Sequence, residues 1–227
     1  MEEGEKVKLL IEALIKFSIG LILVMVLLFV PAGTVRYFNG WLFIALLFIP
    51  MIFFGAYLYF KAPELLRKRL KNQEKEEKQK LAISISGIVF IASFVLSGLD
   101  YRFGWTKVSG TVVAVSSILL LAGYLIYMEV MRENAYLSRV VEVVEGQVIV
   151  DSGLYGIVRH PMYSATLLIF LAMPLVLGSY IGFVIMLVYP YAMVIRIRNE
   201  EEILEKELLG YSEYKKRVKY RLIPFIW

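Results

Sequence analysis

Long uncharged stretches recur along the chain and set the first expectation about its fold. Four of them lack Asp, Glu, Lys and Arg altogether, namely residues 17–30, 41–60, 81–99 and 108–128. At about 1.5 Å of rise per residue, stretches of this length cross most or all of a hydrocarbon core of about 30 Å. They predict four membrane helices. We expect Pro31-Ala32-Gly33 to end the first helix and Pro50 to kink the second.

The longest uncharged stretch runs from Pro161 to Ile195 and contains 35 residues. As one helix it would be about 50 Å long, which is far more than a bilayer core requires. A fold-back near Gly178-Ser179 would divide it into a hairpin of two rather short helices. The pattern therefore predicts six membrane segments in an all-α integral membrane protein.

Composition agrees with this interpretation and excludes several classes of protein. The chain is 59% hydrophobic, 20% charged and has a mean hydropathy of +0.68, so it belongs in a bilayer. The absence of cysteine excludes disulfides, thiolate zinc sites, iron–sulfur clusters and cysteine nucleophiles. One histidine, His160, leaves little for a metal cluster, so we expect no metal. The acidic N-terminus lacks a small-residue cleavage site, which predicts a retained first helix.

The distribution of basic residues predicts the orientation, because cytoplasmic loops carry the excess of Lys and Arg. With the N-terminus inside, 22 of the 25 basic residues fall on the cytoplasmic side, and only Arg36, Arg102 and Lys107 fall outside. Both termini should be cytoplasmic. The net charge of +5 and the pI near 9.2 then indicate contact with membrane lipids rather than nucleic acid.

The predicted cytoplasmic segment before residue 161 has features of a functional site. Two β-branched runs, residues 139–145 and 148–150, favour extended chain around Gly146-Gln147. Pro161 suits the first turn of a helix, and a helix N-terminus beside Arg159 is a ready anion site. The alternative is that Arg159 and His160 simply anchor the chain at the interface.

The last 32 residues carry an amphipathic pattern. Apolar side chains recur every three or four positions, which predicts a helix that tolerates Gly210: Leu204, Leu208, Tyr211, Tyr214, Val218 and Leu222. The alternative is a basic helix on anionic lipid. Glu200-Glu201-Glu202 favours a cationic ligand instead. We assign no chemistry to residues 61–80, expected as a solvated loop or helix extension, and interpret Asp100 and Arg102 as interfacial.

Together these two segments resemble the isoprenylcysteine carboxyl methyltransferase family, part of a wider set of membrane methyltransferases that includes the phospholipid N-methyltransferases. The resemblance covers about residues 130 to 227. It rests on four motifs in order: Gly153-x-Tyr155-x-x-x-Arg159-His160-Pro161-x-Tyr163, Asn199-Glu-Glu-Glu202, Gly210-Tyr-x-x-Tyr214 and Arg221-Leu-Ile-Pro224. It implies a cytosolic pocket for S-adenosylmethionine, without a Rossmann domain, capped by the amphipathic C-terminal helix.

The resemblance also implies site residues. The cofactor contacts carried over are Gln147, Val148, Ile149, Val150, Tyr155, His160, Pro161, Met162, Tyr163, Glu201 and Glu202, with a looser upstream contact near Val140. The substrate-binding arginine of the family falls in strict register on Ile197, so either neighbour, Arg196 or Arg198, could orient the substrate. Residues 1–128 would then be N-terminal membrane helices and residues 129–227 the catalytic region.

The function implied is a membrane methyltransferase that uses S-adenosylmethionine and acts on a lipid or lipid-linked acceptor. A carboxylate acceptor would be held by Arg196 or Arg198, and an amine acceptor by Glu201 or Glu202. Two alternatives remain. One is a membrane reductase that uses NADPH, which has a similar C-terminal architecture. The other is a non-enzymatic scaffold or transporter, although the membrane stretches carry no ionisable carboxylate or base of the kind transporters use.

Overall fold

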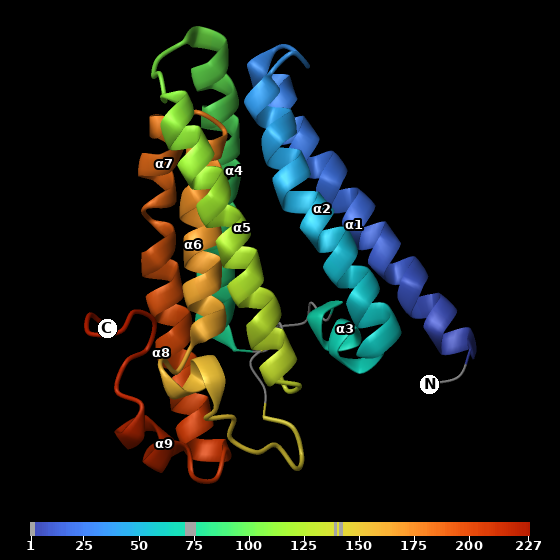
Figure 1. Cartoon of the computed structure of the whole chain (residues 1–227), viewed down its shortest axis with the longest axis vertical. Coiled ribbons are helices and arrows are strands. Elements are labelled where there is room, and N and C mark those ends of the chain that lie inside the picture. The colour runs from blue at the N-terminus through green and yellow to red at the C-terminus, as the bar shows by residue number, and fades with distance from the viewer. Residues whose placement is uncertain (1–2, 71–75, 139, 141–142) are drawn as a thin grey trace.

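Apolar helices that run the length of the molecule make up the fold (Figure 1). The computed structural model describes residues 3–70, 76–138, 140 and 143–227, and all regular structure in these residues is helical. In chain order the elements are α1 (Glu3–Ala32), α2 (Phe38–Lys61), α3 (Pro63–Leu70), α4 (Glu77–Phe103), α5 (Gly110–Glu133), the 3₁₀ turn η1 (Gly153–Gly156), α6 (Pro161–Val176), α7 (Tyr180–Met186), α8 (Tyr189–Glu207) and α9 (Tyr211–Arg217).

Six passes through the bundle follow from these helices. Five are long and apolar enough to cross a membrane: α1, α2, α4, α5 and the combined stretch Tyr180–Glu207. The sixth, α6, is a shorter apolar helix of 16 residues. The prediction of an all-helical, multi-pass membrane protein is confirmed. Figure 1 places the two termini toward the same end of the bundle, where α3 and α9 also lie.

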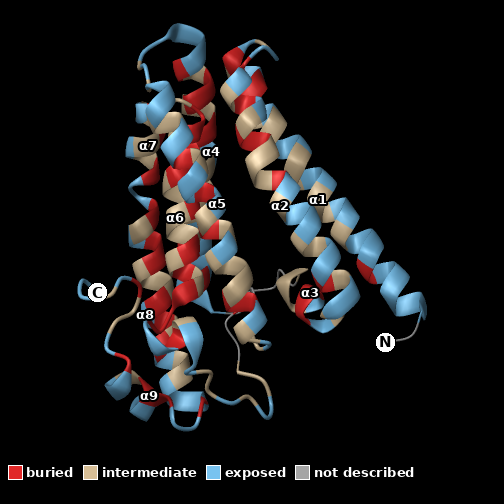
Figure 2. Ribbon diagram, in the orientation of Figure 1, coloured by how far each residue is buried: buried red, intermediate tan, exposed pale blue. Residues whose placement is uncertain are grey.

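The outward faces of the helices remain apolar, as a lipid-facing surface requires. Ile19 and Ile22 on α1, and Phe53 and Phe60 on α2, are exposed although they are large hydrophobic residues. In Figure 2 the buried residues gather instead on the facing sides of α4, α6 and α8. Since a soluble monomer rarely exposes such continuous apolar surface, this distribution agrees with a bilayer as the solvent.

Charged residues extend the N-terminal helices beyond their uncharged cores. Helix α1 begins at Glu3, well before the uncharged stretch, and Glu12 and Lys16 pair along it at 2.7 Å. The Lys16 ammonium also donates to the Leu70 carbonyl oxygen, 2.5 Å away, at the end of α3. Part of the charged stretch 61–80 is therefore helical and tied to α1.

The predicted hairpin forms, and two residues set its shape. Gly178 turns the chain with a φ of +81°, and the Ser179 hydroxyl then caps α7 by accepting from the Gly182 N–H at 3.0 Å. The second limb is divided after Met186. Pro190 lies four residues later, where it has no N–H to donate and its ring would clash with the Met186 carbonyl of a continuous helix.

The prediction of one amphipathic helix through Gly210 is wrong. Helix α8 ends at Glu207, α9 contains seven residues, and the last ten residues are irregular. Gly210 adopts a φ of +84°, a left-handed conformation that ends helices and is unstrained only without a Cβ. The periodic apolar residues still face inward, because Leu208, Tyr211, Tyr214 and Val218 form one buried cluster.

Asp100, expected at the membrane interface, is buried within the protein near the end of α4. It is 1% exposed and accepts from the Thr106 N–H at 2.7 Å, the Thr106 hydroxyl at 2.5 Å and the Ser179 hydroxyl at 2.5 Å. It fastens the end of α4 to the start of α7. The predicted extended chain at residues 148–150 forms no strand, and residues 139, 141 and 142 of the other β-branched run lie outside the described residues.

Candidate active site

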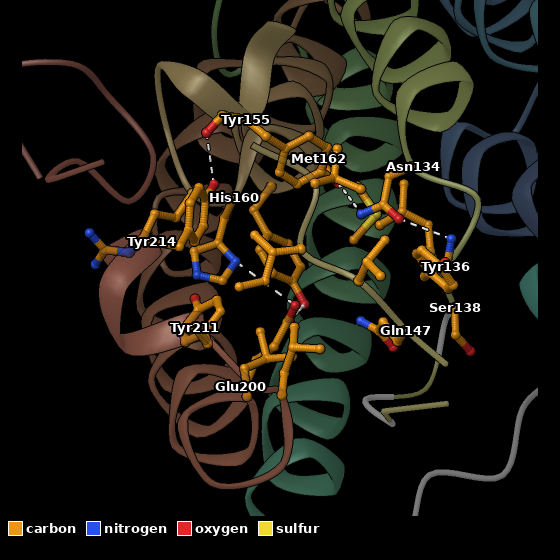
Figure 3. Close-up of a pocket in the computed structure, with 18 of the residues that line it drawn as sticks. Asn134, Tyr136, Ser138, Gln147, Tyr155, His160, Met162, Glu200, Tyr211 and Tyr214 are labelled. Carbon is orange, nitrogen blue, oxygen red and sulfur yellow. Dashed lines mark hydrogen bonds and ion pairs between the residues drawn. The ribbon is translucent and has the colours of Figure 1, made fainter. Parts of the chain in front are cut away.

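A pocket opens at the end of the bundle that holds α9. It encloses about 830 Å³ of space, including the part open to solvent. Figure 3 shows His160, Tyr211 and Tyr214 on one side of it, and Asn134, Tyr136 and Gln147 on the other. Three parts of the chain, distant in sequence, thus form its walls.

Backbone hydrogen bonds fasten the C-terminal segment over the start of α6. The N–H groups of Arg159 and His160 donate to the carbonyls of Tyr220 and Arg221, each at 2.9 Å. The Ser164 hydroxyl donates to the Leu222 carbonyl oxygen at 2.6 Å. The segment after α9 therefore lies against the start of α6, next to α9, whose Tyr211 and Tyr214 line the pocket.

A buried carboxylate holds this arrangement together. Glu201 is 3% exposed, and its Oε1 accepts from Arg159 Nε at 2.7 Å and lies 3.2 Å from His160 Nε2. Its Oε2 accepts from Arg221 Nε at 2.9 Å, and Lys215 Nζ lies 4.0 Å away. Arg159 also donates to the carbonyls of Val218 and Lys219. Because Arg159 is buried in this network, the interpretation of it as an interfacial anchor is wrong.

The acidic group that reaches the pocket is Glu200. Its carboxylate accepts from the Tyr163 hydroxyl at 2.5 Å and lies 3.8 Å from His160 Nδ1. Arg196 Nε donates to the same Tyr163 hydroxyl at 2.8 Å. The pocket wall therefore presents a carboxylate and a guanidinium joined through one phenol, which suits a ligand that carries charges of both signs.

Tyr211 lines the pocket, and its buried hydroxyl has no hydrogen-bond partner among the described residues. Burial raises the pKa of this hydroxyl, and the neighbouring carboxylates of Glu201 and Glu200 raise it further. It therefore stays protonated and able to donate. An unsatisfied buried hydroxyl costs free energy, so a hydrogen-bond acceptor at this position would stabilise the protein.

The opposite wall offers backbone groups. Among the described residues, Val148, Ile149 and Val150 make no backbone–backbone hydrogen bond. The Tyr155 hydroxyl beside them accepts from Asn134 Nδ2 at 3.0 Å, and burial raises the pKa of that hydroxyl. Free amide and carbonyl groups next to a neutral phenol can bind a planar heterocycle through hydrogen bonds.

Most of the residues expected at the site line this pocket. The lining includes Val140, Gln147, Val148, Ile149, Val150, Tyr155, His160, Met162, Tyr163 and Arg196. Pro161 is fully buried at the start of α6 instead. Glu201 lies behind the wall in its ion-pair network.

Two expected residues lie elsewhere. Arg198 is exposed, and Glu202 is exposed and paired with Lys78 at 2.7 Å, so neither is among the lining residues. Their neighbours Arg196 and Glu200 reach the pocket because a shift of two residues on a helix turns a side chain to the other face.

Sequence reasoning missed several residues that support the pocket. Gln79, in a stretch to which no chemistry was assigned, is fully buried, and its Nε2 donates to Asn199 Oδ1 at 2.9 Å and to the Arg196 carbonyl oxygen at 3.0 Å. A lone amide within a charged run gives no sequence signal of this role. Tyr211 and Tyr214 belonged to a recognised motif, but their contacts depend on the break at Gly210.

A second cavity adjoins the first. It encloses about 980 Å³, again with open space, and lies among apolar residues of α4, α6 and α8. The two cavities share Ser138, Met162, Tyr163 and Arg196 as lining residues. A polar pocket and an apolar cavity thus meet at one wall. Within the described part of the chain, no group of three or more acidic or histidine side chains is placed to hold a metal ion.

Comparison with known proteins adds two similarities. Residues 111–209 match the family model of the phospholipid methyltransferases, PEMT. A Delta(14)-sterol reductase of Mus musculus, TM7SF2, is 35% identical over 85 residues, which is 36% of this chain and 20% of the reductase. The chain thus covers about a fifth of that relative's length. The phospholipid methyltransferase family and the sterol reductase belong to a wider membrane superfamily that also includes the isoprenylcysteine carboxyl methyltransferases.

Proposed function

We propose that this chain is a membrane methyltransferase that binds S-adenosylmethionine in the polar pocket and a lipid-borne acceptor in the adjoining apolar cavity. The observation that carries the proposal is the shared wall at Met162, Tyr163 and Arg196. A group transfer between a water-soluble donor and a lipid requires the two to meet at such a boundary. The match to the phospholipid methyltransferases over residues 111–209 supports the same reaction class.

The polar pocket suits the chemistry of this cofactor. S-adenosylmethionine carries a sulfonium, an ammonium and a carboxylate, and the wall offers the Glu200 carboxylate near the Arg196 guanidinium. The Tyr211 hydroxyl has no hydrogen-bond partner among the described residues, so its proton remains for a ligand acceptor. The backbone of residues 148–150 can serve the adenine edge. A polyphosphate ligand would gain nothing from Glu200 in its wall.

The residues of the chain contribute position and exclusion of water. Bound S-adenosylmethionine supplies an electrophilic methyl group, which the acceptor's lone pair takes in line while the electron pair of the broken C–S bond goes to sulfur. Met162 and Tyr163 lie where donor and acceptor sites meet, and the C-terminal segment covers the polar pocket. Catalysis by alignment and desolvation of the nucleophile requires no covalent intermediate on the protein.

Several finer points belong to the same proposal. We place both termini and the polar pocket on the cytoplasmic side, because 22 of the 25 basic residues then face the cytoplasm. Residues 129–227 form the catalytic region and residues 1–128 the preceding membrane helices. Methyl transfer to a carboxylate, as in the isoprenylcysteine carboxyl methyltransferases, is favoured over transfer to an amine, since Arg196 lines both cavities.

The direct test is isothermal titration of the purified full chain with S-adenosylhomocysteine, with NADPH titrated in parallel. We expect saturable binding of S-adenosylhomocysteine alone. Binding of NADPH alone would overturn the proposal in favour of a reductase. If folded protein bound neither ligand, the result would favour a non-enzymatic scaffold or transporter.

A membrane reductase is the second candidate, favoured by one observation. The similarity to the Delta(14)-sterol reductase TM7SF2 reaches 35% identity over 85 residues. Such an enzyme would bind NADPH in the same polar pocket. The Glu200 carboxylate in the wall favours the methyltransferase, because it would repel the phosphates of a nicotinamide dinucleotide.

Tyr211→Phe tests the cofactor pocket with a small change. The hydroxyl has no protein partner, so its removal should leave the thermal stability of the ligand-free protein unchanged or slightly raised. Affinity for S-adenosylhomocysteine should fall by about fivefold to tenfold, which corresponds to one lost hydrogen bond.

Tyr214→Phe is the matched control for this variant. The Tyr214 hydroxyl donates to the Tyr155 carbonyl oxygen at 2.7 Å, so its loss should lower stability. If Tyr211→Phe also lowers stability and leaves affinity intact, Tyr211 does not bind the ligand.

A further inference from the structure

The second cavity contains more positive charge in its wall than the proposed reaction requires. Its walls are mainly apolar, yet two guanidinium groups line it, Arg69 and Arg196. No Asp or Glu is present among its described lining residues. Cations in an apolar wall without a lining carboxylate favour an anionic ligand, because a partly desolvated guanidinium gains most from an opposite charge.

Arg69 is held in a fixed position at the end of α3. Its Nη1 donates to the Ser138 carbonyl oxygen at 3.1 Å and contacts Met162 Sδ at 3.5 Å, and its Nη2 donates to the Tyr127 hydroxyl. All these partners are neutral groups. The guanidinium is thus placed against Met162, a residue of the wall shared by the two cavities, while it keeps its full positive charge.

A third cavity meets the second at the same arginine. It encloses about 950 Å³ with open space, lies among apolar residues of α2, α5 and α6, and is also lined by Arg69. Thr166 and Phe170 line the second and the third cavity alike. Arg69 therefore lies where the second and third cavities join. This position suits a ligand whose acidic head contacts Arg69 and whose hydrocarbon extends into both cavities.

We propose that Arg69, together with Arg196, binds an acidic group of the acceptor, so that the acceptor is an anionic amphiphile whose hydrocarbon occupies the apolar cavities. The identification of this ligand as the methyl acceptor rests on the proposed function, and its negative charge is inferred from the two guanidinium groups. Arg69 is thus a substrate-binding residue that holds the acidic head near Met162 and Tyr163, where the polar pocket begins. It lies outside residues 111–209, so the family match gives no indication of it.

Competition binding to the purified full chain tests the inference. Bound cis-parinarate, a fluorescent 18-carbon fatty acid, is displaced by four probes of equal chain length: oleate, oleyl phosphate, oleyl alcohol and oleylamine. We expect each acid to bind about tenfold tighter than the alcohol, as one or two charge-assisted hydrogen bonds allow. The ratio of oleate to oleyl phosphate distinguishes a carboxylate from a phosphate head.

Variants at two neighbouring arginines make the test specific. Arg69→Gln should bring the acids within about twofold of the alcohol, and Arg69→Lys should keep part of the preference because it keeps the charge. Arg67→Gln is the matched control. Arg67 belongs to the same helix but is exposed, lies 3.8 Å from Glu5 and lines neither cavity, so its loss should change nothing.

The outcomes separate this inference from the proposed function. Equal affinity of the wild type for acid and alcohol, or equal losses in Arg67→Gln and Arg69→Gln, would overturn the role of Arg69. Titration with S-adenosylhomocysteine on the same samples reports whether the polar pocket binds its own ligand. If that ligand fails to bind while the preference for acids persists, the proposed function fails and the anion site stands.

Discussion

Glu201→Gln should lower both the affinity for S-adenosylhomocysteine, by at least about tenfold, and the thermal stability of the protein. Glu201 is 3% exposed and balances the charges of Arg159 and Arg221 on its two oxygens. An amide of the same size can accept from one of them only. Removing one partner of a buried ion pair typically costs about 3–5 kcal/mol, because the remaining charge is left without compensation.

We expect the affinity to fall because Glu201 positions the pocket wall, and not because Glu201 contacts the ligand. Glu201 does not line the pocket, but the Arg159 guanidinium that it holds also donates to the carbonyls of Val218 and Lys219. When Arg159 loses its anionic partner, the C-terminal segment loses part of its attachment, and we expect the wall that contains Tyr211 and Tyr214 to shift. Affinity and stability should therefore fall together.

Glu202→Gln is the matched control, one residue along the same helix. Glu202 is exposed and pairs with Lys78, an arrangement worth little in water. Both variants are measured by thermal unfolding and by titration with S-adenosylhomocysteine. Normal affinity in a stable Glu201→Gln protein would show that the network does not position the cap.

Asp100→Ala should destabilise the protein by about 3 kcal/mol or more and leave the affinity for S-adenosylhomocysteine unchanged. The carboxylate accepts three hydrogen bonds from Thr106 and Ser179, and without it these buried donors lose their partner. The effect on affinity should be absent because α3 and α9 mark the pocket end of the bundle, whereas α4, which ends three residues after Asp100, ends at the opposite end (Figure 1).

Tyr101→Phe serves as the control for this variant. Tyr101 follows Asp100 directly, is partly exposed, and its hydroxyl makes a long hydrogen bond of 3.3 Å to the Arg36 carbonyl oxygen. Its loss should change stability by less than about 0.5 kcal/mol. Asp100→Asn should fall between the two, since the amide oxygen still accepts one hydrogen bond. Equal stability of Asp100→Ala and Tyr101→Phe would contradict the role of Asp100 as a fastening.

The helices themselves could be predicted because the bilayer imposes length and apolarity on every span. Uncharged stretches of about 20 residues located α2, α4 and α5, and the hairpin followed from the excess length of residues 161–195. Helix breaks were harder to place. Gly210 within a periodic pattern resembles a tolerated glycine, and only its left-handed φ shows that the helix ends there.

The identity of the residues around the pocket was predictable only in part. The motif from Gly153 to Tyr163 named most of one wall, since those residues are close in sequence. The register of the acidic and basic residues after Ile195 was not decidable, because one position on a helix turns a side chain by about 100°. The structure brings Arg196 and Glu200 to the pocket and leaves Arg198 and Glu202 in solvent.

The sequence by itself determined that this protein is a helical bundle in a membrane and predicted a site near residues 147–163 and 196–214, because hydropathy and local motifs are properties of neighbouring residues. The tertiary structure decided which distant side chains complete the site. Gln79 meets Asn199 across 120 positions, and Arg69 meets Met162 across 93. Such pairs depend on how helices pack, and no local pattern in either segment encodes its partner.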